Sequence, residues 1–137
     1  MRQVQTQLPG STRSFVLLRH ETPPDSDISS HWDLMIQDGD LLATWRLESD
    51  LFQTAQQSAE RIDNHRLEYL TFEGPISNNR GSVRQVDQGE FRIQLSSENE
   101  ISGELHGQTN KTFMRLSRTA NSTHWLLNAR LLNNGDR

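Results

Sequence analysis

The chain has no cysteine among its 137 residues, which excludes disulfide bonds and thiolate metal ligands. It also lacks any apolar run near the roughly 18 residues that a membrane-spanning helix needs. Residues 1–13 are polar and have no apolar segment of the kind found in a signal peptide. From these absences we expect a cytoplasmic protein with no membrane segment.

Positive charge is also scarce. The chain holds 14 basic and 18 acidic residues, a net charge of −4, so it lacks the basic surface typical of proteins that bind duplex nucleic acid. All but one of the basic residues are arginine, which suits bidentate contact with phosphate, although biased codon use explains this equally well. Any nucleic-acid contact must therefore use a local patch, for which the candidates are Arg80, Arg84, Lys111, Arg115 and Arg118.

Hydrophobic residues make up only 32% of the chain, which predicts one domain with a thin core. Short alternating segments separated by turn residues indicate an all-β protein. We expect a mainly antiparallel, small closed or partly open β-barrel over residues 14–132, with at most one or two short helices. Residues 1–13 are predicted to be a flexible tail and residues 133–137 a loose C-terminus. The expected strands lie near residues 14–19, 31–37, 40–47, 67–72, 82–87, 89–96, 100–106, 111–118 and 124–131.

Two segments have a mixed pattern. Residues 51–62 are rich in alanine, glutamine and glutamate, a composition that favours a short helix. Gln88-Gly89 separates two alternating runs, so we expect a turn there between two strands.

The clearest local pattern is the alternation of polar and apolar residues over 31–37. Because successive side chains of a strand point to opposite faces, Trp32, Leu34 and Ile36 are expected to enter the core. His31 and Asp33 then share the other face. An imidazole and a carboxylate two residues apart form half of a divalent-metal site, but they are equally typical of the wet face of a half-buried strand.

The dipeptide Asp38-Gly39 predicts a tight type I′ hairpin. A two-residue turn at this place sets the pairing of the flanking strands. It puts Ala43 and Trp45 on the apolar side, with Trp45 opposite Trp32. On the polar side it puts Arg46 opposite His31.

Several sequence blocks resemble the 3′-phosphoesterase domain of bacterial DNA ligase D. The resemblance covers residues 14–128, most of the chain. Its N-terminal part rests on Phe15–His20, His31-Trp32-Asp33, Asp38-Gly39 and Thr44-Trp45, and its middle on His65-Arg66-Leu67-Glu68-Tyr69 and Phe72-Glu73-Gly74. The closing strands are matched by Leu105-His106-Gly107, Phe113–Leu116 and Trp125-Leu126-Leu127.

The resemblance implies a set of site residues and an activity. It makes His20 a metal ligand beside His31 and Asp33, and it places His65 and Tyr69 at the reacting phosphate as catalytic residues. The implied cofactor is a divalent metal, with Mn²⁺ favoured and Zn²⁺ or another transition metal as alternatives. The implied reaction removes a 3′-phosphate or a 3′-ribonucleotide from nucleic-acid ends during DNA repair. Such ends are then the expected partners, a ligase or polymerase would act with it only in trans, and a monomer is favoured.

The chain also departs from the family pattern. The family has arginine where this chain has Met35, and the loop Glu21–Ser30 is longer and more acidic than its counterpart. Arg46 and Arg80 are therefore our candidates for binding phosphate in place of the missing cation. Two alternatives stay open: a non-catalytic β-barrel that serves as a binding module, and a phosphoesterase that acts on a small molecule.

Overall fold

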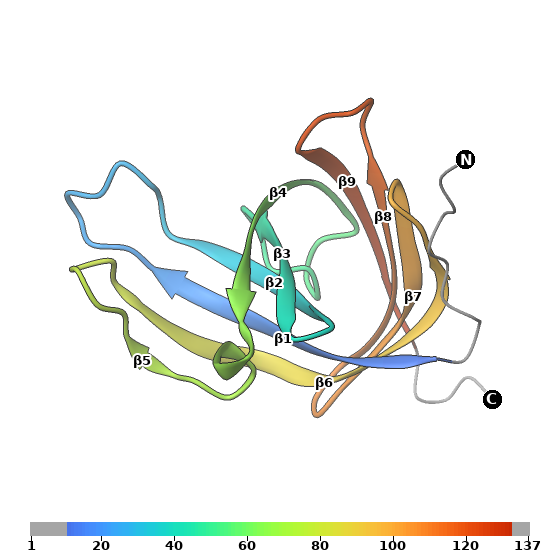
Figure 1. The fold of residues 1–137 in the computed structure, drawn as a ribbon, viewed down its shortest axis with the longest axis horizontal. Coiled ribbons are helices and arrows are strands. Elements are labelled where there is room, and N and C mark those ends of the chain that lie inside the picture. Colours follow the sequence, from blue (N-terminus) through green and yellow to red (C-terminus); the bar gives the residue numbers. More distant parts are fainter. Residues whose placement is uncertain (1–10, 133–137) are drawn as a thin grey trace.

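The computed structural model of the chain describes residues 11–132, so most of the two predicted tails lies outside the described residues. Within this range the chain forms nine strands and one short 3₁₀ helix, η1 (Leu67–Leu70) (Figure 1). The strands are β1 (Thr12–Glu21), β2 (His31–Asp38), β3 (Leu41–Leu47), β4 (Gln56–Arg66), β5 (Gly74–Pro75), β6 (Ser82–Ser96), β7 (Glu100–Gly107), β8 (Lys111–Arg118) and β9 (His124–Leu131).

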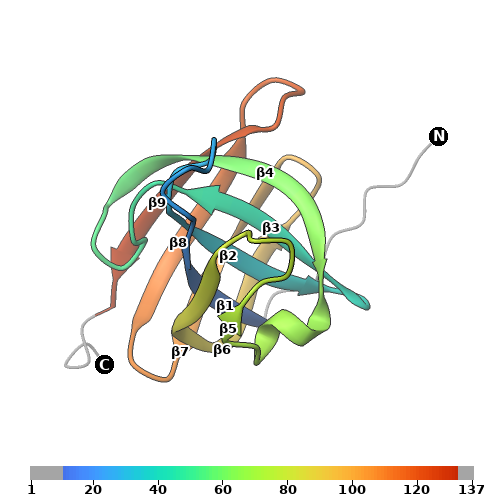
Figure 2. The same cartoon turned by 90° about the vertical axis from the view of Figure 1, so that its left-hand side faces the viewer.

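Eight of these strands close into an antiparallel barrel, which confirms the predicted fold class. The order is β1-β2-β3-β4-β9-β8-β7-β6, and β6 pairs back onto β1 to complete the ring. The short β5 adds to the free edge of β6. Figure 2 shows β4 leading into η1. No helix in the described part of the chain is long and apolar enough to cross a membrane.

The barrel interior is filled by alternate side chains of every strand of the ring, as the sequence pattern predicts. Leu34, Ile36, Ala43 and Trp45 are buried there, and Trp32 packs against the same cluster. Trp45 meets Trp125 of β9 edge to face, with ring centroids 5.5 Å apart. This contact ties the first hairpin to β9, two strands further along the ring.

A second, smaller apolar cluster lies on the opposite face of β1, β2 and β3. Its buried members include Val16, Leu18 and Met35, which alternate with residues of the barrel interior. Leu67 and Tyr69 of η1 pack over it, together with residues of the chain around β5. This outer cluster fixes η1 beside the polar ends of β1 and β2, where the candidate site lies.

The predicted pairing of the first hairpin is wrong by two residues. The loop consists of Gly39 and Asp40, and Asp38 pairs with Leu41. Gly39 has a φ of 67°, and glycine as the first of two loop residues is the pattern of a type II′ turn. Arg46 therefore stands opposite Asp33 and not opposite His31.

The same shift separates the two tryptophans that the sequence predicted to face each other. Trp32 pairs with Leu47, and Trp45 pairs with Leu34. Because the shift is an even number of residues, every side chain of the hairpin keeps the face that the alternation predicted.

Two further expectations fail for physical reasons. Residues 67–70 form η1 and not a strand. The helix that composition favoured over residues 51–62, against the extended segment implied by the family resemblance, does not form: residues from Gln56 onward form β4, because pairing with β3 and β9 outweighs the helical composition. The turn expected at Gln88-Gly89 is also absent, and β6 runs through it without a break. Gly89 permits this because a Cβ at that position would collide with the carbonyl oxygen of His106 on β7.

Candidate metal centre

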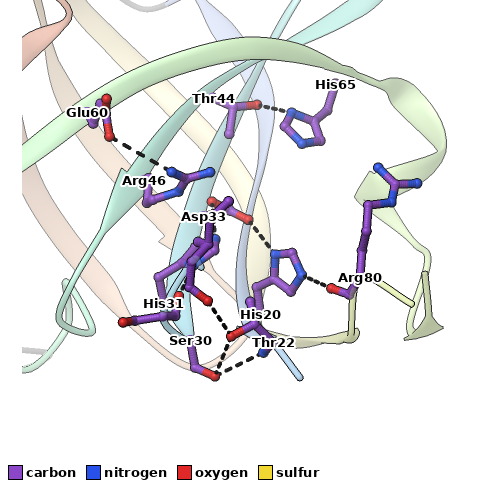
Figure 3. Close-up of polar contacts among 12 residues, drawn as sticks. His20, Thr22, Ser30, His31, Asp33, Thr44, Arg46, Glu60, His65 and Arg80 are labelled. Atoms are coloured by element: carbon purple, nitrogen blue, oxygen red, sulfur yellow. Dashed lines mark hydrogen bonds and ion pairs between the residues drawn. The ribbon is translucent and has the colours of Figure 1, made fainter. Parts of the chain in front are cut away.

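The candidate site begins where β1 and β2 end side by side. His20 of β1 pairs directly with His31 of β2, and Asp33 follows two residues later on the same face of β2. One donor atom of each side chain lies within 4.8 Å of the others, so this group can hold a metal ion (Figure 3). His31 and Asp33 are each only 3% exposed, which places the group at the bottom of a pocket.

The ring nitrogens of the two histidines approach different oxygens of the same carboxylate. His20 Nδ1 lies 3.6 Å from Asp33 Oδ2, and His31 Nε2 lies 3.3 Å from Asp33 Oδ1. The Asp33 Oδ1 atom is buried and has no hydrogen-bond partner. Buried polar atoms are almost always satisfied in proteins, so an unsatisfied carboxylate oxygen beside two imidazoles indicates a place for a cation.

Main-chain carbonyls fix the orientation and tautomer of both imidazoles. His20 Nε2–H donates to the carbonyl of Arg80 at 2.8 Å, and His31 Nδ1–H donates to the carbonyl of Ser29 at 2.7 Å. The remaining nitrogens, His20 Nδ1 and His31 Nε2, then carry lone pairs that point toward Asp33. This is the arrangement found around metal-bound histidine, whose second N–H is held by a carbonyl or carboxylate. The residues present therefore fit a divalent metal.

The charges of the group support one another in the metal-free protein. Burial opposes ionisation of Asp33, but the adjacent imidazoles of His20 and His31 outweigh it and lower the Asp33 pKa to about 2. The contact with Asp33 raises the pKa of His20 above its usual 6.5, against the opposing effect of burial. A metal that binds at His20 Nδ1 competes with any proton at that atom.

These shifts predict how the stability of the metal-free protein depends on pH. The Asp33 contribution is present above the unfolded pKa of 3.8 and is lost as the pH falls toward 2. The His20 contribution is complete below 6.5 and is lost as the pH rises through its raised pKa. The combined contribution of these two groups to the free energy of unfolding is therefore largest between pH 3.8 and 6.5. The lowered pKa of His65 acts in the opposite sense below 6.5, so urea unfolding in chelator compares the protein with His20→Gln across the pH range. The decline above this window should flatten in His20→Gln, and an unchanged decline in that variant would contradict the assignment.

His65 and Tyr69 lie next to this group. His65 Nδ1 is 3.1 Å from Thr44 Oγ1 and 3.0 Å from the carbonyl of Asp63. Since the Thr44 hydroxyl donates to the carbonyl of Leu42, it accepts from His65, and the His65 Nε2 atom keeps its lone pair. Burial lowers the pKa of His65, so its ring is neutral near pH 7. The ring of Tyr69 meets that of His65 edge to face at 5.5 Å.

The two arginines proposed to bind phosphate line the same pocket. The Arg46 Nη1 atom lies 3.9 Å from Glu60 Oε1 of β4, while its Nε atom is buried without a hydrogen-bond partner. Arg80 is folded back: its Nε and Nη2 atoms donate to the carbonyl and hydroxyl of Ser77 at 2.9 and 3.2 Å. Arg80 therefore serves the site first through its main-chain carbonyl, which holds His20.

The pocket has a volume of about 550 Å³. Its floor holds His20, His31 and Asp33, and much of its wall comes from two loops. One wall is the β1–β2 loop, including Asp25, and the other is the β5–β6 loop, including Asn78. A smaller cavity of about 70 Å³ adjoins it, between the metal-ligand group and the outer apolar cluster.

Sequence reasoning missed most of what supports the ligands. Asn78 and Asn79 have φ values of 64° and 54°, and two consecutive residues of positive φ form a type I′ turn. The Asn-Asn pair could have been recognised, because asparagine tolerates this conformation best among residues other than glycine. The Ser29 and Arg80 carbonyls carried no sequence signal, since every residue has a carbonyl group. Of the five basic residues named as a patch, Arg115 instead pairs with Glu100 of β7.

A pair of hydroxyl groups closes the β1–β2 loop just above the ligands. The Ser30 Oγ atom accepts from the main-chain N–H of Thr22 at 2.9 Å, and the Thr22 hydroxyl donates to the carbonyl of Ile28 at 2.7 Å (Figure 3). These bonds hold the chain on both sides of Ser29, whose carbonyl orients His31.

We therefore expect Ser30→Ala to weaken metal binding several-fold, up to about tenfold, with little loss of stability. Titration calorimetry with Mn²⁺ measures the affinity. The matched control is Ser122→Ala, because the Ser122 hydroxyl closes the β8–β9 loop in a similar way, through Thr119 and His124. Equal affinities for the two variants would show that the Ser30 hydroxyl does not position His31.

The fold and the site together define a closed antiparallel β-barrel with a candidate centre of two histidines and one aspartate on the outer face of β1 and β2. A family model described as the DNA ligase D 3′-phosphoesterase domain matches residues 20–127. The chain belongs to this family. The match begins at His20 and includes His31, Asp33, His65 and Tyr69. No curated protein is significantly similar to the chain.

Proposed function

We propose that the chain is a divalent-metal-dependent phosphoesterase that removes a 3′-phosphate or a 3′-ribonucleotide from nucleic-acid ends. The observation that carries the proposal is the geometry of the ligand group. Two histidines, each locked by a main-chain carbonyl, aim their free nitrogens at a buried carboxylate with an unsatisfied oxygen. Membership of the 3′-phosphoesterase family supports a phosphate ester as the substrate.

In this proposal His20 Nδ1, His31 Nε2 and Asp33 hold the metal. Mixed nitrogen and oxygen ligands suit Mn²⁺, which we favour, and also Zn²⁺. When bound, such a metal polarises a phosphoryl oxygen and offsets the charge that develops on it. Three protein ligands leave further coordination positions open for water and substrate, as a catalytic site requires.

The remaining residues act on the protons and charges of the reaction. The neutral His65 ring can accept a proton from the attacking water at Nε2 and return it to the departing oxygen. Tyr69 supplies a phenol hydroxyl beside the His65 ring, which suits hydrogen bonding to a phosphoryl oxygen. Arg46 offers its unpaired Nε–H to the phosphate, and Arg80 can join it when its bonds to Ser77 open.

A non-catalytic binding module is the second candidate, and specific contacts favour it. Arg46 is near Glu60, Arg80 is bound to its own turn, and Met35 is buried where the family carries arginine. Metal binding alone does not separate the two candidates, because a degenerate site can still hold an ion.

Turnover separates them. A labelled primer-template that ends in a 3′-phosphate is incubated with the protein and Mn²⁺, and the 3′-hydroxyl product is followed. The enzyme proposal predicts product with Mn²⁺ and none in chelator. Absence of product with the metal-loaded protein, on both 3′-phosphate and 3′-ribonucleotide ends, would favour the binding module.

A further inference from the structure

The charged residues that line the pocket leave it nearly neutral. Three acidic residues line it, Asp25, Asp33 and Asp63, together with two arginines, Arg46 and Arg80. With the histidines neutral, the formal charge of these lining residues is −1, and a bound divalent cation makes it +1. A phosphate group with a single negative charge would balance this site, whereas a doubly charged phosphate would leave an excess of negative charge.

Both guanidinium groups already have partners. Glu60 lies 3.9 Å from Arg46 and further reduces the field that Arg46 exerts on the pocket. The Arg80 guanidinium donates twice to Ser77, so turning it toward a substrate costs two hydrogen bonds. Neither cation is therefore preorganised to neutralise a second negative charge on phosphate.

The wall beyond the ligand group is partly apolar. Met35, Ile76 and Val83 line the small cavity beside Asp33, and Met35 is 1% and Val83 4% exposed. The one guanidinium group on this cavity belongs to Arg80, which already donates to Ser77. A second negative charge placed here would lose water without a cation ready to balance it, which is costly in a protein interior. His65, on the same cavity, stays neutral because burial lowers its pKa.

The pocket also continues past Arg46. A second hollow of about 410 Å³ shares Arg46 with the first and runs along β3 and β4. Its lining is polar or acidic, with Ser49, Ser58 and Glu60 beside Arg46. This surface suits an uncharged sugar and base better than another phosphate. A phosphate bound at the metal thus has room for a substituent on each side, which a diester has and a terminal monoester lacks.

From the charge balance and the two hollows we infer that this chain acts on a phosphodiester in preference to a terminal phosphomonoester. A monoester carries about −1.5 to −2 charge at pH 7, whereas a diester carries a single charge. In the reaction, the oxygen of water bonds to phosphorus and the P–O bond to the departing group breaks. The departing oxygen takes up the proton that water gives away. This inference rests on the proposed phosphoesterase function and narrows its substrate class.

The direct test compares two DNA primers of the same sequence. One ends in a 3′-phosphate, and the other carries a 3′-terminal ribonucleoside joined by a phosphodiester. With Mn²⁺, we expect kcat/KM for the diester to exceed that for the monoester at least about tenfold, the size of one charge-assisted hydrogen bond. Equal or faster cleavage of the monoester would overturn this inference and leave the phosphoesterase function intact. No cleavage of either primer would instead overturn the proposed function.

Charge-removing variants test the cause of the preference. Asp25→Asn and Asp63→Asn each remove one carboxylate from the pocket wall, and both residues are exposed, so folding should be unaffected. Each should shift the preference toward the monoester roughly two- to fivefold at low salt. The matched control is Asp27→Asn, since Asp27 is exposed on the same loop as Asp25 but does not line the pocket.

A binding measurement keeps the test independent of turnover. The probes are a primer with a 3′-methylenephosphonate, studied at a mildly alkaline pH where it is doubly charged, and its monomethyl ester, which is singly charged. Calorimetry with the Mn²⁺-loaded protein should show tighter binding of the monomethyl ester. The difference in affinity between the two probes should be smaller in the Asp25→Asn, Asp63→Asn double variant. Equal affinities for the two probes, or the same difference in the double variant as in Asp27→Asn, would overturn the inference.

Discussion

Asp33→Asn should reduce metal affinity at least about 100-fold and abolish phosphoester cleavage. The loss of a group that only orients a metal ligand costs 10–100-fold in affinity by itself, so the loss of a ligand costs about that much or more. The substitution keeps the size of the side chain but replaces a buried, ionised ligand, whose pKa is about 2, with a neutral amide. His20 and His31 then have no negatively charged side chain beside them to help bind the cation.

Titration calorimetry with Mn²⁺ and the primer assay measure the two effects of this substitution. Asp38→Asn is the matched control, because Asp38 lies on the same strand, β2, at its exposed end. It should leave both metal affinity and turnover unchanged. If Asp33→Asn binds Mn²⁺ as tightly as Asp38→Asn does, the assigned ligand set is wrong.

Asp87→Ala should destabilise the barrel by at least about 1.5–3 kcal/mol, the usual contribution of hydrogen bonds to a charged group. Asp87 of β6 is 4% exposed. Its carboxylate accepts hydrogen bonds from the main-chain N–H groups of Gln88, Gln108, Thr109 and Asn110, and from the Asn110 side chain. The alanine variant leaves these donors of the β7–β8 turn without their acceptor.

Urea unfolding of the metal-free protein measures this loss. Glu90→Ala is the matched control, because Glu90 is exposed on the same strand and should change stability by no more than about 0.5 kcal/mol. Asp87 is remote from the ligand group, so the folded fraction of Asp87→Ala should still bind Mn²⁺ normally. A stability equal to that of Glu90→Ala would show that water satisfies the freed N–H groups.

The role of Asp87 illustrates what the sequence could not reveal. Nothing in the residues around Asp87 distinguishes it from an exposed acidic residue, because all its partners except Gln88 lie more than 20 positions away in the β7–β8 turn. By contrast, the faces of His31, Asp33 and Trp45 followed from alternation alone. Local periodicity determines which face a side chain takes, whereas long-range main-chain contacts leave no local trace.

The pairing error in the first hairpin shows the same limit at shorter range. Both Asp38-Gly39 and Gly39-Asp40 are acceptable two-residue loops, and the choice depends on the turn type that the rest of the barrel accepts. The error moved Arg46 from His31 to Asp33 but left it on the polar face. The position of His20 came from the resemblance, since the end of an apolar strand does not by itself indicate a ligand.

The most direct test of the metal centre is a crystal structure of the protein grown with Mn²⁺, with the ion located by its anomalous scattering. We predict one peak bound by His20 Nδ1, His31 Nε2 and a carboxylate oxygen of Asp33, at roughly 2.0–2.3 Å from each donor atom. His20 Nε2 and His31 Nδ1 should still donate to the carbonyls of Arg80 and Ser29. A peak elsewhere, or an ion bound through His20 Nε2, would contradict the assignment.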